Sequence, residues 1–263
     1  MLKSNINKGL NLTKQPKYIL FDTETTGASD EDRIIQLGGM VINNKNDIEV
    51  YDEMCSSEVP IKLEAMEVHN ITPDLLEGKP KFNELNFYKR LLELNEPSNY
   101  LIAHNISFDL GMLEKEGFEN NFTIVDTLRC AKHLYSELPY HRLQYLRYAL
   151  EIYKTEQKEA DSLNIVIKAH DAIGDVLVMK LFLRQLAGKC LEIYPDYNPM
   201  EKLAELTKTP VLIKTFRFGK YRGEKIEDIA SKDMGYLSWM RSNMADLDED
   251  MRYTLDKYLQ VQI

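Results

Sequence analysis

The chain has 263 residues, of which 44% are hydrophobic and 29% are charged, and its formal net charge is −9. This composition is typical of a soluble globular protein, and the length suits one main domain of roughly 200 residues with a small addition. No apolar run reaches the roughly 18 residues of a membrane span and the N-terminus lacks the apolar core of a secretory signal, so we expect a cytoplasmic protein with no membrane partner.

Cysteine spacing and charge distribution exclude further classes of protein. Cys55, Cys130 and Cys190 are widely separated and form no C-x-x-C pair, which excludes a disulfide framework and a zinc ribbon. The negative net charge argues against a protein that coats nucleic acid along its whole surface. Basic residues still gather in a predicted N-terminal arm over residues 1–16 and in residues 207–225.

The first half of the chain has the pattern of an antiparallel meander followed by a helix and a strand. The expected strands of the meander span residues 17–22, 34–43 and 47–55, with the polar cluster NNKN supplying the last turn. Apolar residues at helical spacing predict a helix over 84–93. The run YLIAHN, residues 100–105, then predicts a short buried strand.

The second half alternates helical patterns with one short strand. We expect helices over residues 107–115, 127–138, 143–150 and 172–186, and a strand over 123–125. Asp126 is a natural N-cap for the helix that follows it. The loop-like stretch PDYNP predicts a linker over 189–206. The whole pattern indicates an α/β protein with a mixed sheet flanked by helices over 17–188.

Acidic residues follow the ends of two predicted strands and open a late helix. Asp22 and Glu24 follow the apolar run YILF, and residues i and i+2 of a strand point to one face, about 6 to 7 Å apart. Asp109 follows YLIAH, and the run HDAIGD contributes His170 and Asp175. One such acid alone is explained as a helix cap, but four carboxylates together predict bound divalent cations, which favour carboxylate oxygens. Two such ions can assist phosphoryl displacement.

The motifs FDTETTG, HNISFD and HDAIGD, in this order, resemble the three exonuclease motifs of the DEDDh family of 3′-to-5′ exonucleases. This family includes the proofreading epsilon subunit of bacterial DNA polymerase III. The segments DRIIQLGGMVI and EVHNITPDLLEGKPKF extend the resemblance over roughly residues 17–188. The resemblance implies a ribonuclease H-like fold and metal-dependent hydrolysis from the 3′ end of DNA, which releases nucleoside 5′-monophosphates. It also implies a polymerase or DNA-repair partner.

The same resemblance assigns roles in a site with two Mg²⁺ or Mn²⁺ ions. Asp22 would bridge both ions, while Glu24 and Asp175 would complete the site of the ion that holds the attacking water. Asp109 would support the second ion, directly or through water. His170 takes the place of the general base, because an imidazole exchanges protons near neutral pH.

The resemblance also marks expected substrate-binding residues: Thr25, Thr26, Val68, His69 and Phe108. The first two belong to a turn that, in similar enzymes, meets the terminal 3′ nucleotide, although turn formation alone also explains them. An apolar wall can stack on a base without reading its edge, but ordinary core packing also explains Val68 and Phe108. We expect His104 to be a structural hydrogen-bonding residue. Gln36 departs from the family pattern, in which many relatives have an acid, and we expect the extra charge of Asp171 to point away from the site.

The last segment, residues 207–263, resembles the small C-terminal module of exodeoxyribonuclease X-like proteins through FGKYRG and YLSWM. We expect a small α+β module. Its glycines at 219 and 223 lie among aromatic and basic residues, which predicts either a phosphate-contacting hairpin or a small aromatic core with solvated lysines.

Two other functions compete with a DNA exonuclease. The same site would hydrolyse RNA, so a 3′-to-5′ exoribonuclease is the alternative enzyme, although the resemblance favours DNA. A non-catalytic subunit that binds nucleic acid or a polymerase is the alternative from another class. The complete set of four acids and one histidine speaks against it.

Overall fold

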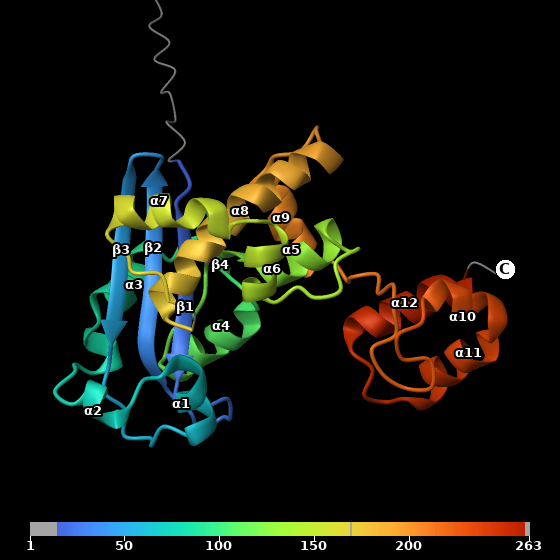
Figure 1. Ribbon diagram of the computed structural model, residues 1–263, viewed down its shortest axis with the longest axis horizontal. Helices are drawn as coiled ribbons and strands as arrows, with labels where there is room; N and C mark the ends of the chain where they lie inside the picture. Colours follow the sequence, from blue (N-terminus) through green and yellow to red (C-terminus); the bar gives the residue numbers. More distant parts are fainter. Residues whose placement is uncertain (1–14, 169, 261–263) are drawn as a thin grey trace, which may run out of the picture.

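The computed structural model describes residues 15–168 and 170–260 (Figure 1). The basic arm expected over residues 1–16 lies outside these ranges except for its last two residues. None of the helices in the described ranges is long and apolar enough to span a bilayer.

A five-stranded mixed sheet forms the centre of the molecule, with the strand order β3-β2-β1-β4-β5. Its strands are β1 (Tyr18–Thr25), β2 (Ile34–Asn44), β3 (Asp47–Met54), β4 (Tyr100–Ala103) and β5 (Thr123–Asp126). The first three form an antiparallel meander, as predicted, and β4 and β5 run parallel to β1. The strand that carries the first two acids is therefore the central strand.

Helices cover both faces of this sheet (Figure 1). They are α1 (Leu63–His69), α2 (Pro73–Leu76), α3 (Asn86–Leu94), α4 (Ile106–Lys115), α5 (Thr127–Leu134), α6 (Leu143–Ala149), α7 (Tyr153–Leu163), α8 (Ala172–Ile193) and α9 (Pro199–Lys208). Leu20 packs with α5 to α9, whereas Ile19 and Phe21 pack with α3 and α4. Apolar residues thus point to both faces of β1, as in a sheet buried on both sides. The predicted α/β fold with a ribonuclease H-like sheet is confirmed.

Local capping chemistry explains where two helices begin. Asp126 caps α5, and its side chain accepts hydrogen bonds from the backbone N–H groups of Leu128 and Arg129, as predicted. Asn198 caps α9 in the same way, with Pro199 as the first helical residue. The linker expected over 189–206 is therefore wrong, because α8 continues to Ile193 and α9 buries apolar residues in the main core. The stretch PDYNP is only the short turn between them.

A glycine lets the first turn of α8 lie directly on the sheet. A Cβ atom at Gly38 of β2 would lie 2.6 Å from the backbone carbon of Ala172 and from the nitrogen of Ile173. Gly38 is the antiparallel partner of Asp22 on β1. This close approach brings the first turn of α8, which contains Asp175, to the acidic end of β1.

The C-terminal module is helical and has its own apolar core. It contains α10 (Ile226–Lys232), α11 (Met234–Asn243) and α12 (Glu249–Gln260), packed around Phe216. Within the described ranges, its β structure is limited to one bridge between Thr215 and Lys225, which is less than the expected α+β module. That bridge closes the FGKYRG loop, where Gly219 has a φ of 75°.

Polar contacts attach this module to α5. Arg129 donates to the carbonyl of Thr209 at 2.7 Å and forms a salt bridge with Asp250 at 3.1 Å. The backbone N–H of Val211 donates to the same carboxylate at 2.8 Å. Because Asp250 is buried, these hydrogen bonds replace most of the water that would otherwise solvate its charge.

The close packing at Gly38 predicts the effect of one added methyl group. We expect Gly38→Ala to lower the free energy of unfolding by roughly 1 to 3 kcal/mol, because α8 must move away from β2. Gly188→Ala is the matched control, since Gly188 lies in α8 with no atom within 4 Å of the added carbon. The control should keep or raise the melting temperature. Equal melting temperatures for Gly38→Ala and wild type would contradict this packing.

Candidate active site

Four acids from three elements meet at the end of the central strand. Asp22 and Glu24 are half-buried on β1. Helix α4 contributes Asp109, which is 4% exposed, and α8 contributes Asp175, which is 9% exposed. Each of the other three acids raises the pKa of Asp22 electrostatically, so the structure brings together the four acids identified in the sequence.

We call these four acids the acidic cluster. Burial and mutual repulsion shift the pKa values of its carboxyl groups. Burial, followed by repulsion from Asp109, raises the pKa of Asp22 well above its ordinary value. Burial and the charge of Asp175 raise the pKa of Glu24 to about 8. Burial is also the main cause of a pKa of about 7 for Asp109 and about 6 for Asp175. Without a cation, the cluster therefore retains protons near neutral pH.

Asp109 is held by the residue between the two acids of β1. Its Oδ1 atom accepts hydrogen bonds from the backbone nitrogen of Thr23 at 3.1 Å and from its hydroxyl at 2.7 Å. Both bonds lower the pKa of Asp109 and partly offset its burial. Thr23 thus links the carboxylate of α4 to the strand that carries Asp22 and Glu24.

A hydrogen-bonded series of polar side chains holds Asp175, and the sequence did not predict it. Gln144 of α6 donates from Nε2 to Oδ1 of Asp175 at 2.5 Å. Arg147 donates to Oε1 of Gln144 at 3.1 Å, so the amide nitrogen must face Asp175. Arg147 is in turn paired with Glu156, with Nε donating to Oε2 at 2.7 Å. These side chains come from two helices that flank α8, a proximity that the sequence does not reveal.

Gln36 connects the sheet to the first turn of α8. It faces Glu24 in the β1–β2 register. Its Nε2 atom donates to Asp52 at 2.8 Å and to Asp171 at 3.1 Å. The expectation that Asp171 points away is wrong, because Asp171 is the N-cap of α8 and its charge contributes to the raised pKa of Asp22.

His170 lies in the exposed turn that precedes α8. Its φ of 56° is in the left-handed region, which is uncommon for histidine. Its backbone N–H donates to the carboxylate of Asp175, and the charge of its side chain lowers the pKa of that acid. The structure therefore places His170 beside the acidic cluster.

The acidic cluster has the donor atoms that divalent metal ions prefer. Within residues 15–168 and 170–260, no three His, Cys, Asp or Glu side chains already form a metal-binding group. The donor set nevertheless fits hard divalent cations, because it consists of carboxylates whose repulsion a cation would relieve. The residues that would hold such ions are Asp22, Glu24, Asp109 and Asp175.

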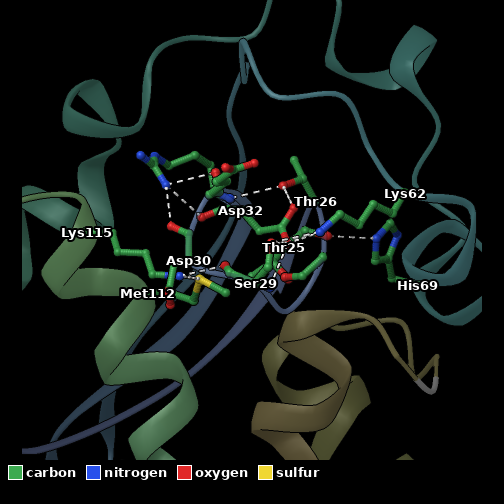
Figure 2. Close-up of polar contacts among 12 residues, drawn as sticks. Thr25, Thr26, Ser29, Asp30, Asp32, Lys62, His69, Met112 and Lys115 are labelled. Atoms are coloured by element: carbon green, nitrogen blue, oxygen red, sulfur yellow. Dashed lines mark hydrogen bonds and ion pairs between the residues drawn. The ribbon is translucent and has the colours of Figure 1, made fainter.

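A hydrogen-bonded turn follows the two acids of β1 (Figure 2). Its centre is Asp32, which is fully buried and accepts from the hydroxyl of Thr26 at 2.9 Å and from Lys62 at 2.5 Å. Burial alone would raise the pKa of Asp32, but bonds from Lys62, Ser29 and Thr26 outweigh it and hold that pKa well below its usual range. This ionised centre fixes the path of the chain beside the acidic cluster.

The expected substrate-binding residues differ in their accessibility. Thr26 is fully buried, and its hydroxyl is bound to Asp32. His69 donates from Nε2 to the carbonyl of Thr25 at 3.2 Å and accepts at Nδ1 from a backbone nitrogen, while burial lowers its pKa. Val68 is 44% exposed, and Phe108 is half-buried. Their contact with a nucleotide stays a prediction, for which Val68 offers the most accessible surface.

His104 has the structural role that we expected. Its Nε2 atom donates to the carbonyl of His141 at 2.9 Å, and Nδ1 pairs with the hydroxyl of Thr127 at 2.9 Å. Burial lowers its pKa to about 4, so it is neutral. It links the end of β4 to the loop before α6.

Comparisons with known proteins cover nearly the whole described chain. Residues 19–182 match a family model described as "Exonuclease", and residues 216–244 match "Exodeoxyribonuclease X-like C-terminal". Exodeoxyribonuclease 10 of Escherichia coli is 26% identical over 247 residues, which cover 92% of this chain and 98% of that protein. A PolC-type DNA polymerase III of Bacillus cereus is 31% identical over 198 residues, which cover 73% of this chain but 13% of the polymerase.

A solved structure of exonuclease X in complex with 5′ overhanging duplex DNA shares the fold. The TM-score is 0.50 at 18% identity, and the match covers 72% of this chain and 99% of that one.

The raised pKa values predict how stability depends on pH in the absence of metal. Since the folded-state pKa values exceed the ordinary values near 4, the folded state binds extra protons, and this stabilisation is lost as the pH rises through about 6 to 8. In EDTA, we expect the melting temperature of wild type to fall relative to that of Glu24→Gln between pH 5 and 8.5.

Added Mg²⁺ should raise the melting temperature more at pH 8 than at pH 5, because fewer protons compete. A difference between wild type and Glu24→Gln that stays constant with pH, together with a pH-independent Mg²⁺ effect, would contradict the raised pKa values.

Proposed function

Because the chain belongs to the exonuclease family and is a 3′-to-5′ exonuclease, we propose that it shortens DNA from the 3′ end and releases nucleoside 5′-monophosphates. The observation that carries this proposal is the convergence of four acids and His170 at the end of β1. Such a cluster has no use in stabilising a fold, since buried like charges repel each other.

The relatives support DNA as the substrate class. The names of the Escherichia coli and Bacillus cereus relatives refer to a deoxyribonuclease and a DNA polymerase, and the solved neighbour holds duplex DNA. The polymerase likeness also supports a replication or repair partner as a further proposal. The division into an exonuclease domain and a C-terminal module is also a proposal, with α9 assigned to the exonuclease domain because it packs in the main core.

We further propose that Asp22, Glu24, Asp109 and Asp175 hold two divalent ions, Mg²⁺ or Mn²⁺. When bound, such ions would stabilise the negative charge that develops on the phosphodiester. The chain's own contribution is to orient two of these carboxylates. Thr23 orients Asp109. Gln144 orients Asp175.

His170 is proposed as the general base. Its exposed position lets its imidazole reach a water molecule at the edge of the acidic cluster. On accepting the proton, the imidazole becomes positively charged, and the neighbouring carboxylate of Asp175 stabilises that charge. The same contact orients the turn that carries His170.

The direction of hydrolysis and the role of the acidic cluster can be tested together. With Mg²⁺, a 5′-labelled DNA oligonucleotide should give progressively shorter labelled strands and nucleoside 5′-monophosphates. Asp22→Asn should reduce the rate by roughly 10² or more, because the charge that holds the ions is lost. Asp196→Asn, at an exposed site in another part of the chain, is the control with wild-type activity expected.

Immediate release of the labelled end nucleotide would contradict the proposed direction, and wild-type activity of Asp22→Asn would contradict the acidic cluster's role. Faster cleavage of a matched RNA would favour the exoribonuclease alternative.

The general-base role predicts a change in the pH profile. His170→Ala should lower single-turnover hydrolysis by roughly 10² to 10⁴ and remove the inflection on the acid side, because the neutral imidazole is no longer available. Added free imidazole should restore part of the rate. If His170→Ala keeps the wild-type profile, the proton leaves the water by another route and the assignment fails.

A further inference from the structure

A groove lies where the C-terminal module meets the exonuclease domain. Residues 136–139 and 141, which follow α5, and residues 211–215, 217 and 218 of the module line a cavity of 390 Å³. An adjoining cavity of 550 Å³ shares Lys132, Pro139, His141 and Arg217 with the first and adds Tyr140 and Arg142. We call these two cavities together the junction groove.

Positive charge converges on the larger cavity from three separate segments. Lys132 comes from α5, Arg142 immediately precedes α6, and Arg217 immediately precedes FGKYRG in the loop that the Thr215–Lys225 bridge closes. No acid is among the described residues that line this cavity. In a protein with a net charge of −9, three cations facing one hollow form a site for an anion.

Lys220, a basic residue of the FGKYRG segment, has a local acidic partner. Lys220 forms a salt bridge with Asp233 at 3.1 Å, and its ammonium group lies over the ring of Tyr221. The acids of the smaller cavity are Glu137, Asp248 and Asp250, and the last is bound by Arg129 and lies 4.0 Å from the ammonium group of Lys132. The positive character of the junction groove therefore depends on Arg217 rather than on the loop as a whole.

His141 gives a second, independent sign of a ligand. It lines both cavities, and it is only 7% exposed. Its Nε2 atom donates to the carbonyl of Tyr135 at 3.0 Å, which leaves Nδ1 as an acceptor. Among the described residues, this buried Nδ1 atom has no partner. Every nucleobase carries an N–H group that could donate to it.

Exposed aromatic rings flank the cations. Tyr140 is 55% exposed on one side of the junction groove and Phe218 is 40% exposed on the other. The guanidinium of Arg142 lies 5.3 Å from the centre of the Tyr140 ring. Rings beside cations suit a single strand, whose bases stack while its phosphates pair with the cations.

Residues that line the junction groove are connected to the acidic cluster by neighbouring positions in the chain and by hydrogen bonds. Arg142 lies two residues before Gln144, the residue that donates to Asp175. The carbonyl of His141 also accepts from His104 at the end of β4. The junction groove and the acidic cluster are therefore connected through the start of α6 and the end of β4.

We propose that the junction groove binds the single strand of nucleic acid that leads to the 3′ end being hydrolysed. Lys132, Arg142 and Arg217 contact its phosphates. Tyr140 and Phe218 stack on its bases. This proposal rests on the proposed function, since it places the substrate of that same site. An acidic peptide would satisfy the cations but leaves the exposed rings and the nearby acidic cluster without a purpose.

Equilibrium binding of a fluorescein-labelled oligodeoxythymidine of about 20 nucleotides, in EDTA, tests this proposal without turnover. Arg217→Glu and Arg142→Glu, from different segments, should each weaken binding about tenfold. Each should also lower the slope of log affinity against log salt by about 0.7 or more, as expected for a lost phosphate contact. Arg222→Glu is the matched control, because Arg222 is exposed in the same loop but does not line the junction groove.

Thermal unfolding should show that all three variants fold. Equal affinities and salt slopes for Arg217→Glu, Arg142→Glu and Arg222→Glu would overturn the proposal. Polyglutamate that displaces the oligonucleotide at comparable concentration would also overturn it, by indicating a peptide site. Failure of the proposed function itself is seen separately, as absence of nucleotide release by the wild-type protein and by Arg222→Glu.

Discussion

The convergence of four carboxylates, two of them buried and two half-buried, is the constraint on which this structure depends. One strand and two helices create it, although burial raises the pKa of every acid involved and repulsion among them raises the pKa values of Asp22 and Glu24 further. The cost is tolerable because hydrogen bonds hold Asp109 and Asp175 in place and because protons or cations can neutralise the charge. The same acids that destabilise the fold without cations make the end of β1 a strong site for hard cations.

The supporting contacts show how the fold serves this site. Gly38, the strand partner of Asp22, has no side chain, so the first turn of α8 lies directly against β2. This packing places Asp175 of α8 near Asp22. The hydrogen bonds that run from Glu156 through Arg147 to Gln144 then hold the carboxylate of Asp175. A stable core helix and a precise catalytic geometry are here two consequences of one packing arrangement.

Sequence patterns predicted the parts of this arrangement that depend on local chemistry. Alternating apolar residues predicted the meander, and Asp126 was identified as a helix cap because its oxygen can reach the next free N–H groups. The acids followed from motif order and from their positions after strands. Gln144 and Glu156 were missed because their roles arise from the packing of separate helices. The start of α9 was missed although Asn198 and Pro199 form a recognisable helix start.

The central claim is that the acidic cluster carries protons that divalent cations replace. Calorimetric titration of the wild-type protein with Mn²⁺ at pH 7, in two buffers with different ionisation enthalpies, measures that exchange directly. We predict a difference in heat that corresponds to release of more than about one proton per chain, and its absence in Asp22→Asn, which does not hold the ions. Heats of binding that are the same in both buffers would contradict the account.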